Sequence, residues 1–157
     1  MPLIRIETNI NAPIEICFDL SRSIDLHQVS TAQTNEKAIG GKTRGLINLN
    51  ETVTWQATHF GIKQKLTAKI TRFNRPFYFR DEQLKGAFKK LEHDHYFTQK
   101  EATVLMTDAL LFESPLGTLG TMFNNLVLIN YMRNFIIKRN EVIKDFAETG
   151  KWKQLLL

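Results

Sequence analysis

Cysteine is nearly absent from this sequence of 157 residues, which contains only Cys17. A single cysteine excludes an intrachain disulfide and a metal site made of several thiolates. This cysteine usage is typical of a reducing compartment, so we expect a cytoplasmic protein. No stretch approaches the roughly 18 apolar residues of a membrane span, and the first residues lack the charged and apolar regions of a secretory signal. We therefore expect no integral membrane association.

A strong excess of one charge is also missing, since 21 Lys plus Arg oppose 16 Asp plus Glu and leave a net charge of +5. This modest positive charge suits solubility or weak attraction to anionic surfaces. We expect a row of basic side chains on the outer face of one strand, made of Lys63, Lys65, Lys69 and Arg72. This row lacks the interleaved aromatic side chains that stack on nucleic-acid bases. No phosphate-binding glycine motif or GxSxG nucleophile motif occurs, and Cys17 is expected to be a buried small hydrophobe. We expect no nucleic-acid partner.

Repeats, low-complexity tracts and Pro/Gly-rich linkers are missing as well, so the sequence predicts one domain over residues 1–157. Alternating residues over 2–10 predict a strand, and Pro13 marks the start of a short helix. A second short helix, capped by Ser21 or Ser23, is expected to extend to about His27. The polar segment 31–44 is interpreted as a loop.

The remainder of the chain changes from a strand period to a helix period. Extended runs are predicted at 51–60, 63–72, 77–83, 87–98 and 102–113, for which an antiparallel meander is the simplest topology. After Pro115, apolar residues at helical spacing predict one helix of over thirty residues that continues to about Ala147 and ends before Gly150. The terminal segment KWKQLLL is a tail without a predicted position.

This order of elements predicts a cavity. A curved sheet of six or seven strands must cover one face, yet the chain offers one long helix and two short ones. A helix about 10 to 12 Å wide cannot fill the concave side of so broad a sheet. Space is therefore expected to remain between the sheet and the long helix.

The same order resembles the helix-grip fold of the START and birch-pollen-allergen superfamily, also called SRPBCC proteins. The resemblance covers residues 2–147 and rests on NAPIEICFDL, GLINLNETVTWQATHFG, FYFRDEQLKGAF, LEHDHYF, TDALLFESPLG and the long helix. The patterns VTWxAxHFG, FxDEQ and HxHxF look like a bacterial single-domain subgroup described as polyketide cyclase-like or ligand-binding. The resemblance implies an α+β fold, with a curved sheet of about seven antiparallel strands around one C-terminal helix. It does not imply a reaction, because the superfamily shares a pocket and not a catalytic set.

Alternation along the strands predicts which polar side chains share the inner face with apolar ones. On that face we expect three histidines and two aspartates, together with Phe77 and several other apolar residues. The predicted ligand-binding residues are Trp55, His59, Phe79, Asp81, Gln83, His93, His95, Phe97, Met106, Asp108, Met122 and Leu126. Buried polar groups without partners cost about 1 to 3 kcal/mol each, so these must pair with one another, hold water or contact a ligand.

Several interpretations of the inward groups remain open. His93 and His95 could each bond Asp81 or Asp108 in a self-satisfied network, or they could contact a ligand. A His-x-His pair with a carboxylate also has the ligand types of a two-histidine, one-carboxylate metal site. The spacing alone is weak evidence, and the resemblance is to pockets that are usually metal-free, so we expect no metal and no cofactor.

The leading functional hypothesis is a binding module for a small hydrophobic or amphipathic molecule, held between the sheet and the long helix. The alternative is a cyclase or hydratase-type enzyme, in which His95 paired with Asp108 moves protons. A third class is an interaction protein that docks onto other proteins or membranes, to which the +5 charge and the terminal segment would contribute. The sequence carries no signal for an oligomeric state.

Overall fold

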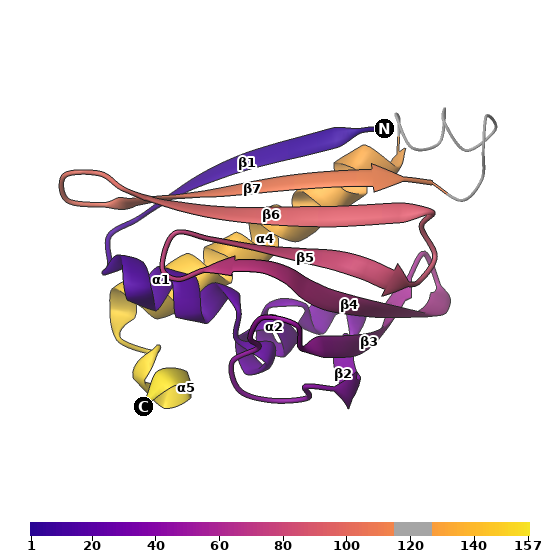
Figure 1. Cartoon of the computed structure of the whole chain (residues 1–157), viewed down its shortest axis with the longest axis horizontal. Helices are drawn as coiled ribbons and strands as arrows, with labels where there is room; N and C mark the ends of the chain where they lie inside the picture. Colours follow the sequence, from indigo (N-terminus) through magenta and orange to yellow (C-terminus); the bar gives the residue numbers. More distant parts are fainter. Residues whose placement is uncertain (115–126) are drawn as a thin grey trace.

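A computed structural model of the chain describes residues 1–114 and 127–157. Its centre is a seven-stranded sheet in the order β1-β7-β6-β5-β4-β3-β2, in which all neighbours are antiparallel (Figure 1). The strands are β1 (Leu3–Ile10), β2 (Lys37–Gly41), β3 (Thr52–His59), β4 (Ile62–Asn74), β5 (Tyr78–Lys85), β6 (Lys90–Gln99) and β7 (Val104–Glu113). The predicted meander is thus confirmed for β3 to β7, and β1 lies beside β7 at one edge of the sheet.

The interpretation of residues 31–44 as a loop is wrong in part. A short 3-10 helix, η1 (Ala32–Thr34), is followed there by the edge strand β2, which pairs with β3. The sequence pattern does not predict this strand, because it is short and contains two glycines, Gly40 and Gly41, so that no alternating pattern forms. Its register also shifts between Ala38 and Gly40.

The two short helices follow β1 as predicted, as α1 (Ile14–Ser21) and α2 (Ile24–Ser30). Pro13 precedes the first turn of α1, where its missing N–H costs nothing. Ser23 caps α2, since its side-chain oxygen accepts a hydrogen bond of 3.1 Å from the backbone N–H of Leu26.

The long helix α4 (Ile129–Thr149) runs across one face of the sheet (Figure 1) and ends at Gly150, which has the left-handed conformation. It has 21 residues, and residues 115–126 of the longer predicted helix, with Met122 and Leu126, lie outside the described residues. None of the described helices is both long and apolar enough to cross a membrane.

The core has two parts. The larger part surrounds Phe18 of α1. The Phe18 ring meets the rings of Phe73, Phe79 and Phe97 edge to face, with ring centroids 5.2 to 5.4 Å apart. The smaller one lies between β1, β7 and α4 and consists of Ile4, Leu110, Phe112 and Ile136. The C-terminal tail forms α5 (Lys153–Leu156), from which Leu155 and Leu156 pack against the larger part.

One inward prediction fails beside the core. Phe77 was expected to share the buried face of Phe79, but it precedes β5 and is 54% exposed. The alternation of a strand does not extend into the turn before it, so Phe77 does not follow the pattern. Cys17, by contrast, is fully buried as expected, and this burial raises its pKa to about 12.

Candidate functional site

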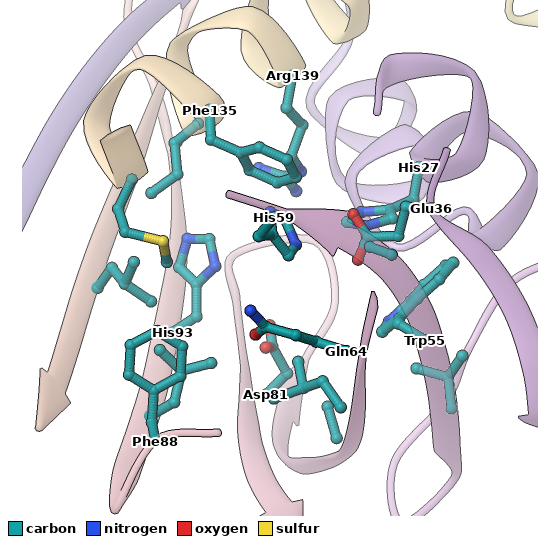
Figure 2. A pocket seen from close by; sticks show the side chains of 18 of the residues that line it. His27, Glu36, Trp55, His59, Gln64, Asp81, Phe88, His93, Phe135 and Arg139 are labelled. Carbon is teal, nitrogen blue, oxygen red and sulfur yellow. The ribbon is translucent and has the colours of Figure 1, made fainter. Parts of the chain in front are cut away.

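A cavity of about 460 Å³ lies between the sheet and α4, as the sequence predicts. This volume is within the range of pockets that enclose small organic molecules. Its wall is mainly apolar and includes Ile24, Val53, Leu66, Ala68, Ile70, Leu91, Leu110, Met132, Phe135 and Ile136. Figure 2 shows Gln64 and Asp81 from the sheet and Phe135 and Arg139 from α4 pointing toward this common space.

Half of the twelve predicted site residues line the cavity. They are Trp55, His59, Phe79, Asp81, His93 and His95. All six lie on β3, β5 or β6, where the alternation assigns them to the inner face. Met122 and Leu126 lie outside the described residues.

Four predicted site residues lie elsewhere. Gln83 turns its amide to the carbonyl of Phe88, at 2.7 Å. Phe97 and Met106 belong to the larger part of the core, because α1 fills that end of the concave face. Asp108 is fully buried behind the imidazoles of β6. The inner face of a strand is therefore not the same as the cavity wall, since one end of the sheet is occupied by α1.

Several polar groups of the wall were not among the predicted site residues. Tyr131 and Arg139 come from α4, His27 from α2, and Glu36 from the segment before β2. Arg139 lies three residues after Ile136 and four before Ile143, so helical spacing could have placed it on the buried face. Glu36 offers no such signal, because it lies in the segment that was interpreted as a loop.

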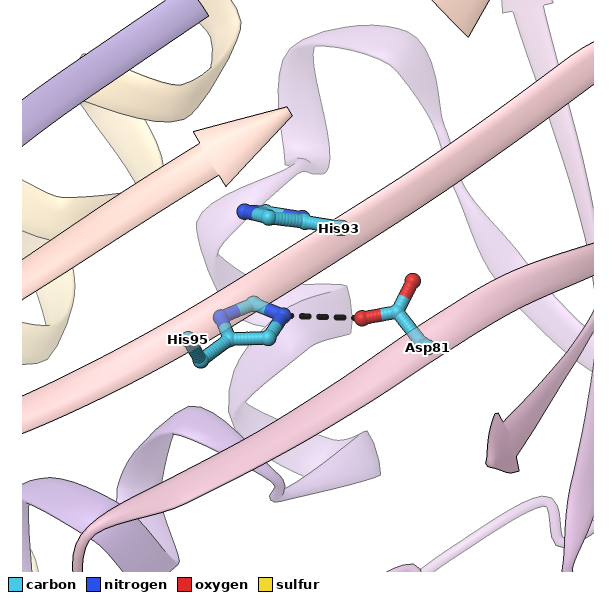
Figure 3. A group of neighbouring side chains, drawn as sticks. All are labelled: Asp81, His93 and His95. Carbon is cyan, nitrogen blue, oxygen red and sulfur yellow. Dashed lines mark hydrogen bonds and ion pairs between the residues drawn. The ribbon is translucent and has the colours of Figure 1, made fainter. Parts of the chain in front are cut away.

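A network of side chains connects His93 and His95 of the cavity wall to the carboxylates of Asp81 and Asp108. Figure 3 shows the two imidazoles together with Asp81. Nε2 of His95 lies 2.8 Å from Oδ2 of Asp81, and Nε2 of His93 lies 2.8 Å from Oδ1 of Asp108. The Nδ1 atom of His95 lies 3.2 Å from Oδ1 of Asp108, at ion-pair distance but without the alignment of a hydrogen bond. The two imidazoles lie against each other, with ring centroids 3.8 Å apart.

Asp108 is the centre of this network. Its Oδ1 also accepts a hydrogen bond of 3.2 Å from Arg139, and its Oδ2 accepts one of 2.6 Å from Asn140. Burial alone would raise the pKa of Asp108, but the contacts with His93 and His95 and the charge of Arg139 hold it well below its usual range. Asp108 is therefore an anion inside the protein.

The two imidazoles respond in opposite directions. Burial lowers the pKa of His93, and the neighbouring charge of His95 lowers it further. Burial also opposes charge on His95, but its contacts with Asp108 and Asp81 outweigh that effect and raise its pKa. Of the two imidazoles, His95 is therefore the one that accepts a proton more readily.

A second polar group lines another part of the cavity. Nε2 of His27 lies 3.4 Å from Oε1 of Glu36, and the His27 ring lies against Trp55 with centroids 4.2 Å apart. Nδ1 of His59 lies 2.6 Å from the hydroxyl of Tyr131. An apolar wall thus carries two separate clusters of polar side chains, which is the lining expected of a pocket that orients a ligand.

Comparison with solved structures shows what fold this is. A protein of Thermus thermophilus superposes with a TM-score of 0.76 and 16% identity, covering 93% of this chain and 97% of that one. A START superfamily protein from Mycobacterium smegmatis has a TM-score of 0.69, 12% identity and 98% of both chains covered. Ginseng major latex-like protein 151 from Panax ginseng has a TM-score of 0.68 and 12% identity, covering 93% and 97%. No family model and no curated protein matches the sequence.

The chain therefore has the helix-grip fold that the sequence resemblance predicts. Its seven antiparallel strands, long C-terminal helix and two short helices after the first strand are the elements of that fold. At 12 to 16% identity, these likenesses concern the arrangement of the backbone. What the cavity does has to be argued from its own residues.

Proposed function

We propose that the protein binds a small hydrophobic or amphipathic molecule in the cavity between the sheet and α4. The observation that carries this proposal is a volume of about 460 Å³ with a mainly apolar wall. A packed core leaves few voids larger than a water molecule, so a space of this size is not an ordinary packing defect. Binding of an apolar ligand is favourable here, because the ligand displaces water from the apolar wall.

The polar side chains of the wall favour an amphipathic ligand over a pure hydrocarbon. His93 and Asp81 have partly accessible side chains, at 13% and 27% exposure, so each can offer a polar atom to a ligand. His59 and Tyr131 offer a second such position. A ligand with one or two polar groups on an apolar body matches this distribution.

The test is binding of the fluorescent dye 1-anilinonaphthalene-8-sulfonate and its displacement by decanoic acid. Ala68 lies on the cavity wall and is buried, so Ala68→Phe should place a ring in the space and lower dye affinity at least tenfold. The matched control is Ala102→Phe, at an exposed position in the turn between β6 and β7. Thermal unfolding of both variants shows whether they fold.

The proposal is wrong if the wild-type protein binds no dye. It is also wrong if folded Ala68→Phe and Ala102→Phe bind the dye equally, because the dye would then occupy another surface. Loss of dye in Ala68→Phe alone supports the cavity.

The alternative, an enzyme of the cyclase or hydratase kind, is favoured by one contact, the hydrogen bond of 2.8 Å between His95 and Asp81 at the wall. A histidine held by a carboxylate can transfer protons to or from a carbonyl compound. Asp108 is too deeply buried to touch a ligand, so Asp81 replaces it in this hypothesis. The test is deuterium exchange beside the carbonyl of a diketone in heavy water. Exchange in the wild-type protein that Asp81→Asn abolishes would support it.

A further inference from the structure

Three side chains with metal-binding chemistry meet on the cavity wall. Asp81 of β5 lies directly opposite His93 of β6, and His95 follows two residues later on the same face of the sheet. One ligating atom from each lies within 4.8 Å of the other two (Figure 3). Two imidazoles and one carboxylate are the donor set that suits zinc and other divalent first-row transition ions.

The spacing is compatible with one shared ion. Bonds of about 2.0 to 2.2 Å to such an ion place tetrahedral ligand atoms about 3.3 Å apart. His95 and Asp81 already approach to 2.8 Å, so their separation has to widen slightly. His93 has to move inward by no more than about 1.5 Å, which small rotations of side-chain torsions supply.

A carboxylate lies behind the two imidazoles, where it can orient them toward a bound metal ion. Such histidines usually donate their other ring N–H to a carboxylate, which fixes the ring orientation. Asp108 lies beside both rings: its Oδ1 is hydrogen-bonded to Nε2 of His93 at 2.8 Å and lies 3.2 Å from Nδ1 of His95, at ion-pair distance. This leaves Nδ1 of His93 and Nε2 of His95 as the atoms for an ion, and Asp108 is itself held by Arg139 and Asn140.

The net charge of this cluster also favours a bound cation. Asp81 and Asp108 contribute two negative charges, and Arg139 contributes one positive charge. With neutral imidazoles the cluster therefore carries one net negative charge in a mainly apolar wall. A divalent ion between His95 and Asp81 would replace the proton that otherwise bridges them.

We propose that Asp81, His93 and His95 bind one divalent transition-metal ion, with Zn²⁺ as the representative, on the wall of the cavity. Three protein ligands leave at least one coordination position of the ion open to the cavity. This inference goes beyond the proposed function, because the ion would bind whether or not the cavity also holds an apolar molecule.

The test is a titration of the chelator-treated protein with Zn²⁺ against a chromophoric chelator, with Co²⁺ absorption as a second measurement. We expect one ion per chain and a visible Co²⁺ band typical of nitrogen and oxygen ligands. His93→Ala and Asp81→Asn each remove one ligand and should weaken Zn²⁺ binding roughly 100-fold or more. Asp108→Asn, which keeps all three ligands and changes only the carboxylate beside the two imidazoles, should weaken Zn²⁺ binding about 10- to 100-fold.

The matched control is His59→Gln, which removes a histidine from the same cavity but outside this cluster. It should leave Zn²⁺ affinity and the Co²⁺ band unchanged. Circular dichroism checks that each variant is folded. Failure of the wild-type protein to bind a stoichiometric ion would overturn the proposal, as would unchanged Zn²⁺ affinity in folded His93→Ala. An equal loss of affinity in His59→Gln would also overturn it, because histidines in general would then be responsible.

Discussion

Asp108→Asn is the substitution from which we expect the largest loss of stability for the smallest change in shape. The carboxylate is fully buried and accepts bonds from His93, Arg139 and Asn140. Asparagine has nearly the same volume, so no cavity is created. What is lost is the negative charge, and the guanidinium of Arg139 remains buried without a carboxylate partner among the described residues.

The size of the effect follows from that uncompensated charge. Removing one partner of a buried ion pair costs about 3 to 5 kcal/mol. In a chain of this length, 1 kcal/mol corresponds to about 2 to 4 °C in melting temperature. We therefore expect the midpoint of thermal unfolding to fall by roughly 6 to 20 °C.

The assays are thermal unfolding and urea unfolding near pH 7, both followed by circular dichroism in the presence of a chelator so that no metal ion contributes. The control is Asp145→Asn, which breaks the exposed pair with Lys151 and should cost no more than about 1 kcal/mol. Adding Arg139→Met to Asp108→Asn should recover part of the loss, because the orphaned charge is then removed. A loss below about 1 kcal/mol in Asp108→Asn would refute the reasoning.

Three further predictions concern the rest of the fold. Ser23→Ala removes the cap of α2 and should lower the free energy of unfolding by about 1 kcal/mol in urea titrations, whereas Ser23→Asp should retain most of it. Phe18→Ala empties the centre of the larger core and should cost about 3 to 5 kcal/mol in the same assay. Burial opposes charge on Asp19, but hydrogen bonds from Arg75 and Arg22 outweigh it and hold its pKa below the ordinary 3.8. The stabilisation is therefore present above that pH and is lost as the pH falls through the lowered pKa, so wild type and Asp19→Asn should converge in unfolding free energy at strongly acidic pH.

The sequence predicts most of this fold because the strong patterns are local. β4 alternates cleanly between basic and apolar residues, and its inner residues Gln64, Leu66, Ala68 and Ile70 all reach the cavity wall as expected. Edge strand β2 is too short and too rich in glycine for such a pattern. The limits of the prediction are thus set by element length.

The candidate site is predicted less completely because a cavity depends on what fills the remaining space. Alternation correctly places Phe97 and Met106 on the inner face, but α1 covers that end of the sheet and turns them into core. Asp108 faces inward as predicted, yet the imidazoles of His93 and His95 separate it from the cavity. These distinctions arise from packing between elements, which no single strand pattern contains.

The most direct measurement of ligand binding in the cavity is nuclear Overhauser contact between an unlabelled fatty acid and ¹³C-labelled methyl groups of the protein. The account predicts contacts from the acyl chain to Ile70, Leu110 and Ile136, which line the cavity from the sheet and from α4. Contacts confined to the exposed Leu3 and Val29, or no contacts at saturating fatty acid, would contradict it.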